Sequence, residues 1–255
     1  SADGSMAVGA SRLPNGETHA VRWGLTTAAQ DLGTLGGGTS IARAVSADGT
    51  VVVGTAQNMM GQYAAFRWTM STGMIQIGPS GPSLRSEAGG VSADGSTVII
   101  TVEKAGPDEL HRWTVGGGAT VLDVASGPTE VILDYKLSDD GLAAILNTFD
   151  LFSGTSRAVY WSAAGGALAF PTNVGPADLS RDGSTVVGTR SQVSSSSLEA
   201  FRWSPVTGFE ILDSATPAYS FAQLITQRAG TSARRLGNAT VPTPSPTAQV
   251  RSRAS

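Results

Sequence analysis

Residues 46–54 read Ser-Ala-Asp-Gly-Thr-Val-Val-Val-Gly, and a tryptophan, Trp68, stands 22 residues after the first serine. Related phrases occur four more times, so the five copies start at residues 1, 46, 92, 138 and 180. Each copy contains one of the chain's five tryptophans, which are Trp23, Trp68, Trp113, Trp161 and Trp203. A period of 42 to 46 residues predicts an array of one repeated supersecondary unit.

The second copy shows which strands one unit is expected to contain. On either side of Ser-Ala-Asp-Gly lie two short stretches, residues 42–45 with a strand pattern and residues 50–53, which are all β-branched. An Asp-Gly pair between two such stretches is typical of a hairpin, because glycine adopts the positive φ that a tight turn needs. Residues 63–68 and 74–77 supply a third and a fourth strand. This pattern predicts an all-β fold, a β-propeller of about five four-stranded blades.

The chain divides into residues 1–227, which carry the five repeats, and residues 228–255, a tail rich in Arg, Pro, Ser and Thr. Prolines at alternate positions keep the tail extended, and it has few apolar residues, so we expect it to be disordered. The five arginines of the tail come without any acid, so removing their +5 from the net charge of −3 leaves −8 for residues 1–227. An acidic body argues against nucleic-acid binding.

The first copy begins at its turn and therefore lacks the strand that precedes the turn in the other copies. Residues 219–225 follow the fifth copy and could supply it. If they pair with the first strand of copy one, the N- and C-terminal strands close the ring, and the exposed strand edges disappear. In the alternative, the chain is an open piece of a larger ring, and residues 219–225 begin a sixth blade. We favour closure.

Composition sets further bounds on the chain. Its 255 residues are 40% hydrophobic and 15% charged, as in a folded globular protein. No run of eighteen apolar residues occurs, so we expect no membrane span in this fragment. The absence of cysteine excludes disulfides and thiolate metal sites. Because the chain begins inside a repeat phrase, we expect it to be part of a longer product.

The repeated acids are the first candidates for chemistry. The five turns contribute Asp3, Gly4, Asp48, Gly49, Asp94, Gly95, Asp140, Gly141, Asp182 and Gly183. A ring of carboxylates could hold calcium, which takes several oxygen ligands. Each aspartate, however, stands at the same place in its own hairpin, where its side chain can accept hydrogen bonds from the turn backbone. We therefore interpret these residues as turn-forming, and we expect no cofactor.

The five tryptophans have a structural and a functional interpretation. Phe66 and Trp68 are two residues apart on one strand, so they share one face. We interpret the tryptophans as core residues between blades, with the neighbouring arginines reaching solvent or a nearby acid. The alternative is a ring of exposed tryptophans that stack on carbohydrate. The two histidines, His19 and His111, fall in non-adjacent repeats, which argues against a catalytic or zinc-binding pair.

The repeat resembles a known bacterial family. His19-Ala20-Val21-Arg22-Trp23 and the segment Asp-Leu-Gly-Thr-Leu-Gly-Gly-Gly-Thr-Ser at residues 31–40 are similar to the extracellular HAF repeats, although no copy here has a complete His-Ala-Phe. The resemblance covers residues 1 to about 225. It implies a secreted or surface-displayed protein, sometimes the passenger of an autotransporter, without known enzymatic activity. The Ser-x-Asp-Gly hairpin is also similar to the turn in propeller repeats of the TolB type.

These observations lead to a functional hypothesis. We expect a non-enzymatic protein at the cell surface or outside the cell that serves as a binding or surface-display module. Its partners, carbohydrate or protein, would bind the loops that vary between copies, because loops on a rigid scaffold carry function. These loops are residues 13–18, 57–62, 103–109, 150–156 and 191–198. The alternatives are a propeller hydrolase or lyase acting on polysaccharide, and a structural spacer in a larger secreted protein.

Overall fold

The computed structural model describes residues 1–124, 129–191, 198–212, 221–226 and 231–236. All regular structure in these residues is β-strand, which confirms the all-β class. No helix that could cross a membrane is found among them.

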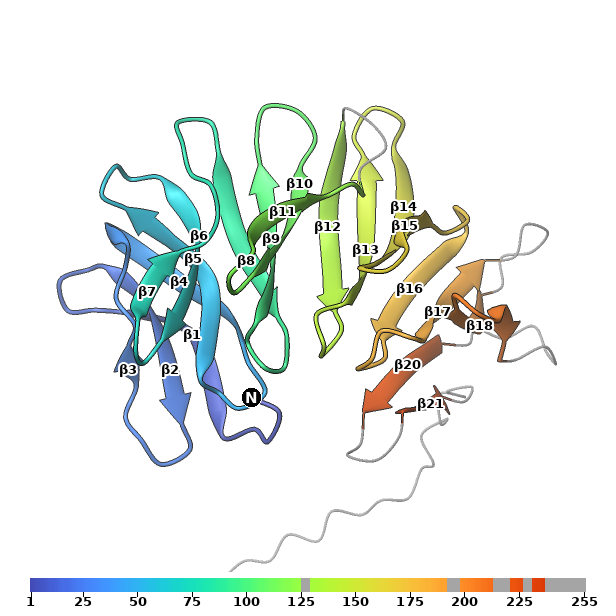
Figure 1. Ribbon diagram of the computed structural model, residues 1–255, viewed down its shortest axis with the longest axis horizontal. Helices are drawn as coiled ribbons and strands as arrows, with labels where there is room; N and C mark the ends of the chain where they lie inside the picture. The colour runs from blue at the N-terminus through green and yellow to red at the C-terminus, as the bar shows by residue number, and fades with distance from the viewer. Residues whose placement is uncertain (125–128, 192–197, 213–220, 227–230, 237–255) are drawn as a thin grey trace, which may run out of the picture.

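Each repeat folds into a set of antiparallel strands, which we call a blade (Figure 1). A parallel bridge between Thr18 and Thr39 joins blades one and two into one seven-stranded sheet. Blade one consists of β1 (Met6–Arg12), β2 (Thr18–Gly24) and β3 (Gln30–Asp31). Blade two consists of β4 (Gly36–Val45), β5 (Val51–Asn58), β6 (Tyr63–Thr69) and β7 (Gly73–Gln76). Blade three consists of β8 (Arg85–Val91), β9 (Thr97–Glu103), β10 (Glu109–Thr114) and β11 (Gly118–Leu122). Blade four consists of β12 (Glu130–Leu137), β13 (Ala143–Asp150), β14 (Thr155–Ser162) and β15 (Gly166–Ala169). Blade five consists of β16 (Val174–Leu179), β17 (Val186–Ser191), β18 (Leu198–Ser204) and β19 (Gly208–Ile211).

The blades follow one another in chain order around an arc (Figure 1). The first strands of adjacent blades contact one another, so β4, β8, β12 and β16 form the inner side of the arc. The turns β8–β9, β12–β13 and β16–β17, which carry the Ser-x-Asp-Gly phrase, lie at the lower end in Figure 1. The hairpins β9–β10 and β13–β14 lie at the upper end. The repeated phrase and the variable loops thus occupy opposite ends of the blades.

The last two strands correct the expected closure of the ring. β20 (Phe221–Thr226) pairs with β21 (Thr231–Leu236), and not with β1. β20 contacts β16, β17 and β18, so it lies against blade five and begins a separate two-stranded sheet. A local hairpin closes a short loop at little entropic cost, whereas pairing with β1 would close a loop spanning the whole propeller. Residues 219 and 220, which also belonged to the expected closing strand, lie outside the described residues.

The same hairpin changes the expected start of the tail. β21 falls at residues 231–236, so regular structure continues beyond residue 228, where disorder was expected to begin.

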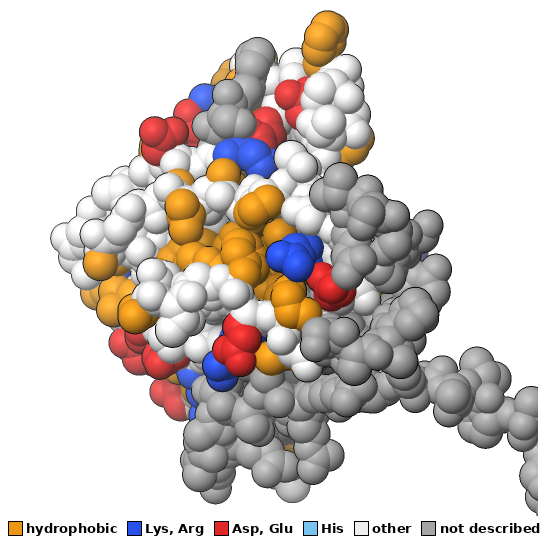
Figure 2. All heavy atoms as spheres, turned by 90° about the vertical axis from the view of Figure 1, so that its right-hand side faces the viewer, with side chains coloured by type: hydrophobic (Ala, Val, Ile, Leu, Met, Phe, Trp, Pro, Cys, Tyr) orange, Lys and Arg blue, Asp and Glu red, His pale blue; other side chains and the backbone are white. Residues whose placement is uncertain are grey.

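Val187 and Ala200 form an apolar cluster with Leu212 on blade five. Val187 is next to Val186, whose side chain packs toward blade four, so the cluster lies on the opposite face of the sheet. Figure 2 shows hydrophobic side chains gathered at this end of the molecule.

The hydrophobic core is divided into layers between adjacent blades. Trp68, Trp113 and Trp161 each pack against residues of the preceding blade. Trp203 packs on Tyr160 and Phe170 of blade four, with ring centroids 4.8 and 5.0 Å away. Trp68, Trp161 and Trp203 are buried, whereas Trp113 and Trp23 are only partly buried. In the described chain no blade precedes blade one, so Trp23 has no preceding blade to pack against.

Candidate functional site

The Ser-x-Asp-Gly phrase forms the same turn in all five blades. In blade two, Ser46 Oγ donates to Asp48 Oδ1 at 2.6 Å and accepts from the Val51 amide at 3.0 Å. Asp48 Oδ1 also accepts from the Thr50 amide at 3.0 Å. Gly49 has a φ of 76°, which explains why glycine ends the phrase. The equivalent serine-to-aspartate hydrogen bonds occur at Asp3, Asp94, Asp140 and Asp182.

These hydrogen bonds also change the pKa values of the turn aspartates Asp48, Asp94 and Asp182. The Ser46 hydroxyl and the Thr50 amide stabilise the carboxylate, so the pKa of Asp48 is lowered. The serine of the turn has the same effect on the pKa values of Asp94 and Asp182. Because Oδ1 of each aspartate accepts hydrogen bonds within its own turn, these residues act as turn formers in this structure. No group of three or more His, Asp or Glu residues suited to a metal ion occurs in the described part of the chain.

The five turns are joined to one another through the residue after each serine. The Ala2 amide donates to the Ala47 carbonyl at 2.9 Å, and the Ala47 amide donates to the Ala93 carbonyl at 2.9 Å. In the same way, the Ala93 amide donates to the Asp139 carbonyl and the Asp139 amide donates to the Arg181 carbonyl, both at 2.7 Å. The repeated turn therefore brings one residue of each blade to a common centre.

The residue before each of the first four tryptophans makes a second contact between blades. Arg67 donates from its NH2 group to the Gly95 carbonyl in the turn of the next blade, at 3.2 Å. Arg22, Arg112 and Tyr160 donate to the carbonyls of Gly49, Gly141 and Gly183 in the same way, at 3.4, 3.1 and 3.0 Å. Arg22, Arg67 and Arg112 thus contact backbone carbonyls of the next blade and not the nearby acid that was expected, whereas Arg202 pairs with Glu210 as expected. Tyr160 replaces the arginine of its repeat and makes the same contact.

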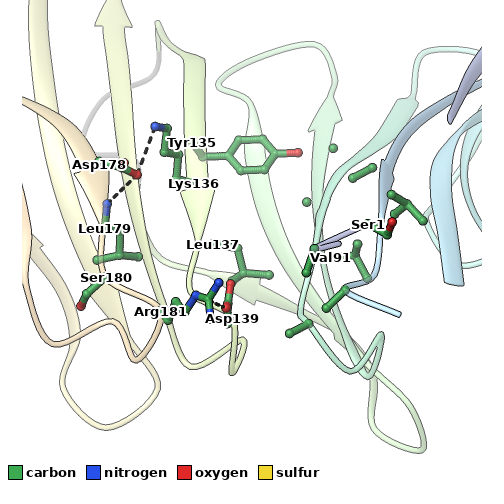
Figure 3. A pocket seen from close by; sticks show the side chains of 17 residues that line it. Ser1, Val91, Tyr135, Lys136, Leu137, Asp139, Asp178, Leu179, Ser180 and Arg181 are labelled. Atoms are coloured by element: carbon green, nitrogen blue, oxygen red, sulfur yellow. Dashed lines mark hydrogen bonds and ion pairs between the residues drawn. The ribbon is translucent and has the colours of Figure 1, made fainter. Parts of the chain in front are cut away.

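A cavity of about 580 Å³ lies at the centre, between the inner strands and the joined turns (Figure 3). Residues at two positions of the repeat line the cavity, and we call each set of equivalent residues a tier. The residues two positions before the turn serine are Ala44, Gly90, Lys136 and Asp178. The residues one position after it are Ala2, Ala47, Ala93, Asp139 and Arg181. Each tier has small residues in blades two and three, and charged residues in blades four and five.

The charged residues of the cavity form two ion pairs between blades four and five (Figure 3). Lys136 Nζ lies 3.2 Å from Asp178 Oδ1, and Arg181 Nε lies 3.3 Å from Asp139 Oδ2. Three of these side chains are about half exposed, at 47 to 51%, while Asp178 is 19% exposed. They can therefore contact a molecule in the cavity. The order of the charges is opposite in the two tiers, because blade four carries the cation in one and the anion in the other.

Tyr135 crosses the inner side of the cavity from blade four to blade three (Figure 3). A Cβ atom at Gly89 would lie 2.2 Å from its hydroxyl oxygen, so only glycine leaves room for this ring. Burial raises the pKa of Tyr135 to about 12. The tyrosine is therefore neutral at physiological pH, and it fixes the two inner strands relative to each other.

The histidines lie away from the cavity and from each other. His19 Nδ1 is 2.9 Å from Asp31 Oδ2, and His19 Nε2 is 3.5 Å from Glu17 Oε2. The two acids take opposite nitrogens of the ring, so they do not converge on one metal ion. His111 Nε2 is 3.0 Å from Glu109 Oε2 on blade three. The structure thus keeps the two histidines in separate blades, as their positions in the repeat indicated.

Comparisons with known proteins identify the architecture. No family model matches the chain, and no curated protein matches its sequence. TolB from Acinetobacter baumannii is similar in structure, with a TM-score of 0.51 and 19% identity over 82% of this chain and 51% of that one. The β-propeller domain of the Trilobed protease from Pyrococcus furiosus, which has an open velcro topology, gives a TM-score of 0.54 and 11% identity over 91% and 74%. The fold is a β-propeller.

A third similar structure is prolyl oligopeptidase B from Galerina marginata, with a TM-score of 0.55 and 9% identity over 90% of this chain and 36% of that one. At such identities the likeness shows the fold alone. The chain spans about half the length of TolB and about a third of the oligopeptidase. The predicted β-propeller is confirmed, and the resemblance to HAF repeats stays a prediction.

Sequence reasoning placed binding in the variable loops and did not identify the central cavity. The signal was present in the repeat, because Lys136 and Asp178 are 42 residues apart, and so are Asp139 and Arg181. Residues at the same position in adjacent repeats lie side by side in a propeller. Charged residues of opposite sign at that spacing therefore indicated contacts between blades.

Proposed function

We propose that the chain is a non-enzymatic binding module at the cell surface or outside the cell, and that the central cavity is its ligand site. The observation that carries this proposal is the cavity itself. Its volume of about 580 Å³ lies within the usual range for ligand pockets. Its lining comes from the inner strands and their turns, which the contacts between blades hold in place, so the site is formed before a ligand binds.

The chemistry of the cavity supports binding over hydrolysis. The alternative function, a polysaccharide hydrolase or lyase, needs a free acid or base within hydrogen-bond reach of the substrate. The two carboxylates that line the cavity, Asp139 and Asp178, are each paired with a cation. The extracellular location rests on the resemblance to HAF repeats and is tested by fractionation of the native host.

The turns provide a matched pair of variants for the binding test. Arg181 occupies the position of Ala93 in the turn of blade five, so the turn accepts arginine there. Ala93→Arg should place a guanidinium group in the cavity without unfolding the protein. Val115→Arg introduces the same group on the outer surface, where Val115 is 61% exposed.

The test screens the wild-type protein by calorimetry against panels of neutral oligosaccharides, acidic oligosaccharides and peptides. We expect a ligand whose affinity falls at least about tenfold in Ala93→Arg and is unchanged in Val115→Arg. Equal binding by both variants would move the site to the variable loops. Release of new reducing ends from a polysaccharide would favour the hydrolase.

A further inference from the structure

The charge pattern of the cavity wall indicates which ligand the proposed binding site takes. Lys136 and Asp178 form one ion pair, and Arg181 and Asp139 form the other. Each tier of the wall therefore has no net charge. Blade four carries the cation of one tier and the anion of the other, and blade five carries the opposite charge in each. Resting on the binding function proposed above, we infer that the cavity binds a neutral oligosaccharide.

A charged ligand fits this wall poorly. An anion that approaches Lys136 also meets Asp178, and an anion that approaches Arg181 meets Asp139. A cation that approaches either carboxylate is repelled by the basic group beside it. Like charges placed together at a binding surface reduce affinity, so the paired arrangement disfavours ligands of either sign.

Hydroxyl groups match the same wall well. A hydroxyl donates one hydrogen bond and accepts others, whereas a carboxylate only accepts and an ammonium or guanidinium group only donates. Neighbouring hydroxyls of one sugar can therefore bond to both members of an ion pair at once. The opposite side of the cavity has Ala44, Ala47, Gly90 and Ala93, whose small side chains leave room for the sugar rings.

The inner strands disfavour a peptide as the occupant. A peptide that adds to a sheet needs a regular, open strand edge. The register is interrupted in all four inner strands, at 42/44 in β4, 88/90 in β8, 132/134 in β12 and 176/178 in β16. Such bulges disrupt the ladder and blunt an edge.

The test compares neutral oligosaccharides with uronic-acid oligosaccharides, sulfated oligosaccharides and peptides of equal length, by calorimetry with the wild-type chain. We expect a neutral oligosaccharide to bind best, with an affinity that is unchanged between about 0.05 and 0.5 M salt. Lys136→Met and Arg181→Met should each weaken binding about tenfold or more, because each removes a hydrogen bond from a charged group.

A charge-swapped variant controls for the structural role of the pair. Lys136→Asp combined with Asp178→Lys keeps an ion pair between blades four and five, so its free energy of unfolding should stay close to that of the wild type. The neutral sugar should nevertheless bind it more weakly, because the hydrogen-bond donor and acceptor have changed places. Preferential binding of a peptide or a charged oligosaccharide, weakened by Ala93→Arg, would overturn the ligand class and leave the binding function standing. If Ala93→Arg weakens no ligand, the binding function at the cavity is itself wrong.

Discussion

The contacts between blades inside the propeller differ from those at its two ends. Between blades four and five, the Trp203 ring packs against the tilted ring of Tyr160, and the Tyr160 hydroxyl donates to the Gly183 carbonyl at 3.0 Å. At one end, Trp23 occupies the same place in its repeat but is only partly buried. At the other end, Arg202 stands where Arg67 stands in blade two, and it pairs with Glu210 of its own blade. The repeat therefore encodes contacts between units. In the described chain no blade precedes blade one, and the strand that lies against blade five, β20, does not belong to a copy of the repeat phrase.

The largest expected difference between interior and end is at the tryptophans. Trp203→Ala should lower the free energy of unfolding by about 3–5 kcal/mol, because it removes a large buried ring from the layer between two blades. Trp23→Ala should cost about 1 kcal/mol, because this ring has no preceding blade to pack against. Urea denaturation at neutral pH measures both changes. Equal losses in the two variants would show that the position of the blade in the propeller does not decide how much its tryptophan contributes to the free energy of unfolding.

A smaller difference is expected at the residue before the tryptophan. Tyr160→Phe removes the hydrogen bond to Gly183 and should cost about 1 kcal/mol. Arg202→Met removes only an exposed ion pair with Glu210 and should cost about 0.5 kcal/mol or less. Urea denaturation again gives the free energies.

Tyr160→Arg is the matched control, because arginine fills this position in the other four repeats. This variant should restore the contact with the next turn and unfold close to wild type. A cost of Tyr160→Arg as large as that of Tyr160→Phe would mean that the tyrosine acts through its ring and not through its hydrogen bond.

The parts of the fold that depend on nearby residues could be predicted from the sequence. The period, the four strands of a repeat and the Asp-Gly turn all follow from residues within one copy. The placement of the tryptophans between blades also followed, because Phe66 and Trp68 are two residues apart and share one face of their strand. These features are local, so the pattern of a single repeat is enough to determine them.

The features that were missed or wrong depend on pairs of repeats. The hydrogen bond from Arg67 to Gly95 and the ion pair between Lys136 and Asp178 each join two blades. Within one repeat these residues look like exposed surface charges. The pairing of β20 could not be predicted either, because β1 and β21 both offer an edge and the choice depends on what packs against blade five. The central cavity arises only when the inner strands meet.

The smallest expected difference concerns the turns themselves, where interior and end should behave alike. The pKa of Asp48 is lowered by hydrogen bonds from Ser46 and Thr50, and the pKa of Asp3 is lowered by those from Ser1 and Ser5. Both sets of donors belong to the same turn as the acid. A carboxylate with a lowered folded pKa stabilises the fold above its unfolded pKa of about 3.9, and this stabilisation is lost as the pH falls through the folded pKa.

Asp48→Asn and Asp3→Asn should therefore reduce the acid sensitivity of folding by similar amounts, because asparagine does not titrate. Urea midpoints measured from pH 7 to about 2 would show a shallower decline below pH about 4 in both variants than in the wild type. An effect of Asp48→Asn without any effect of Asp3→Asn would mean that the turn needs a neighbour on both sides. In that case the hydrogen bonds that join the turns, and not the turn alone, would hold these carboxylates in their charged state.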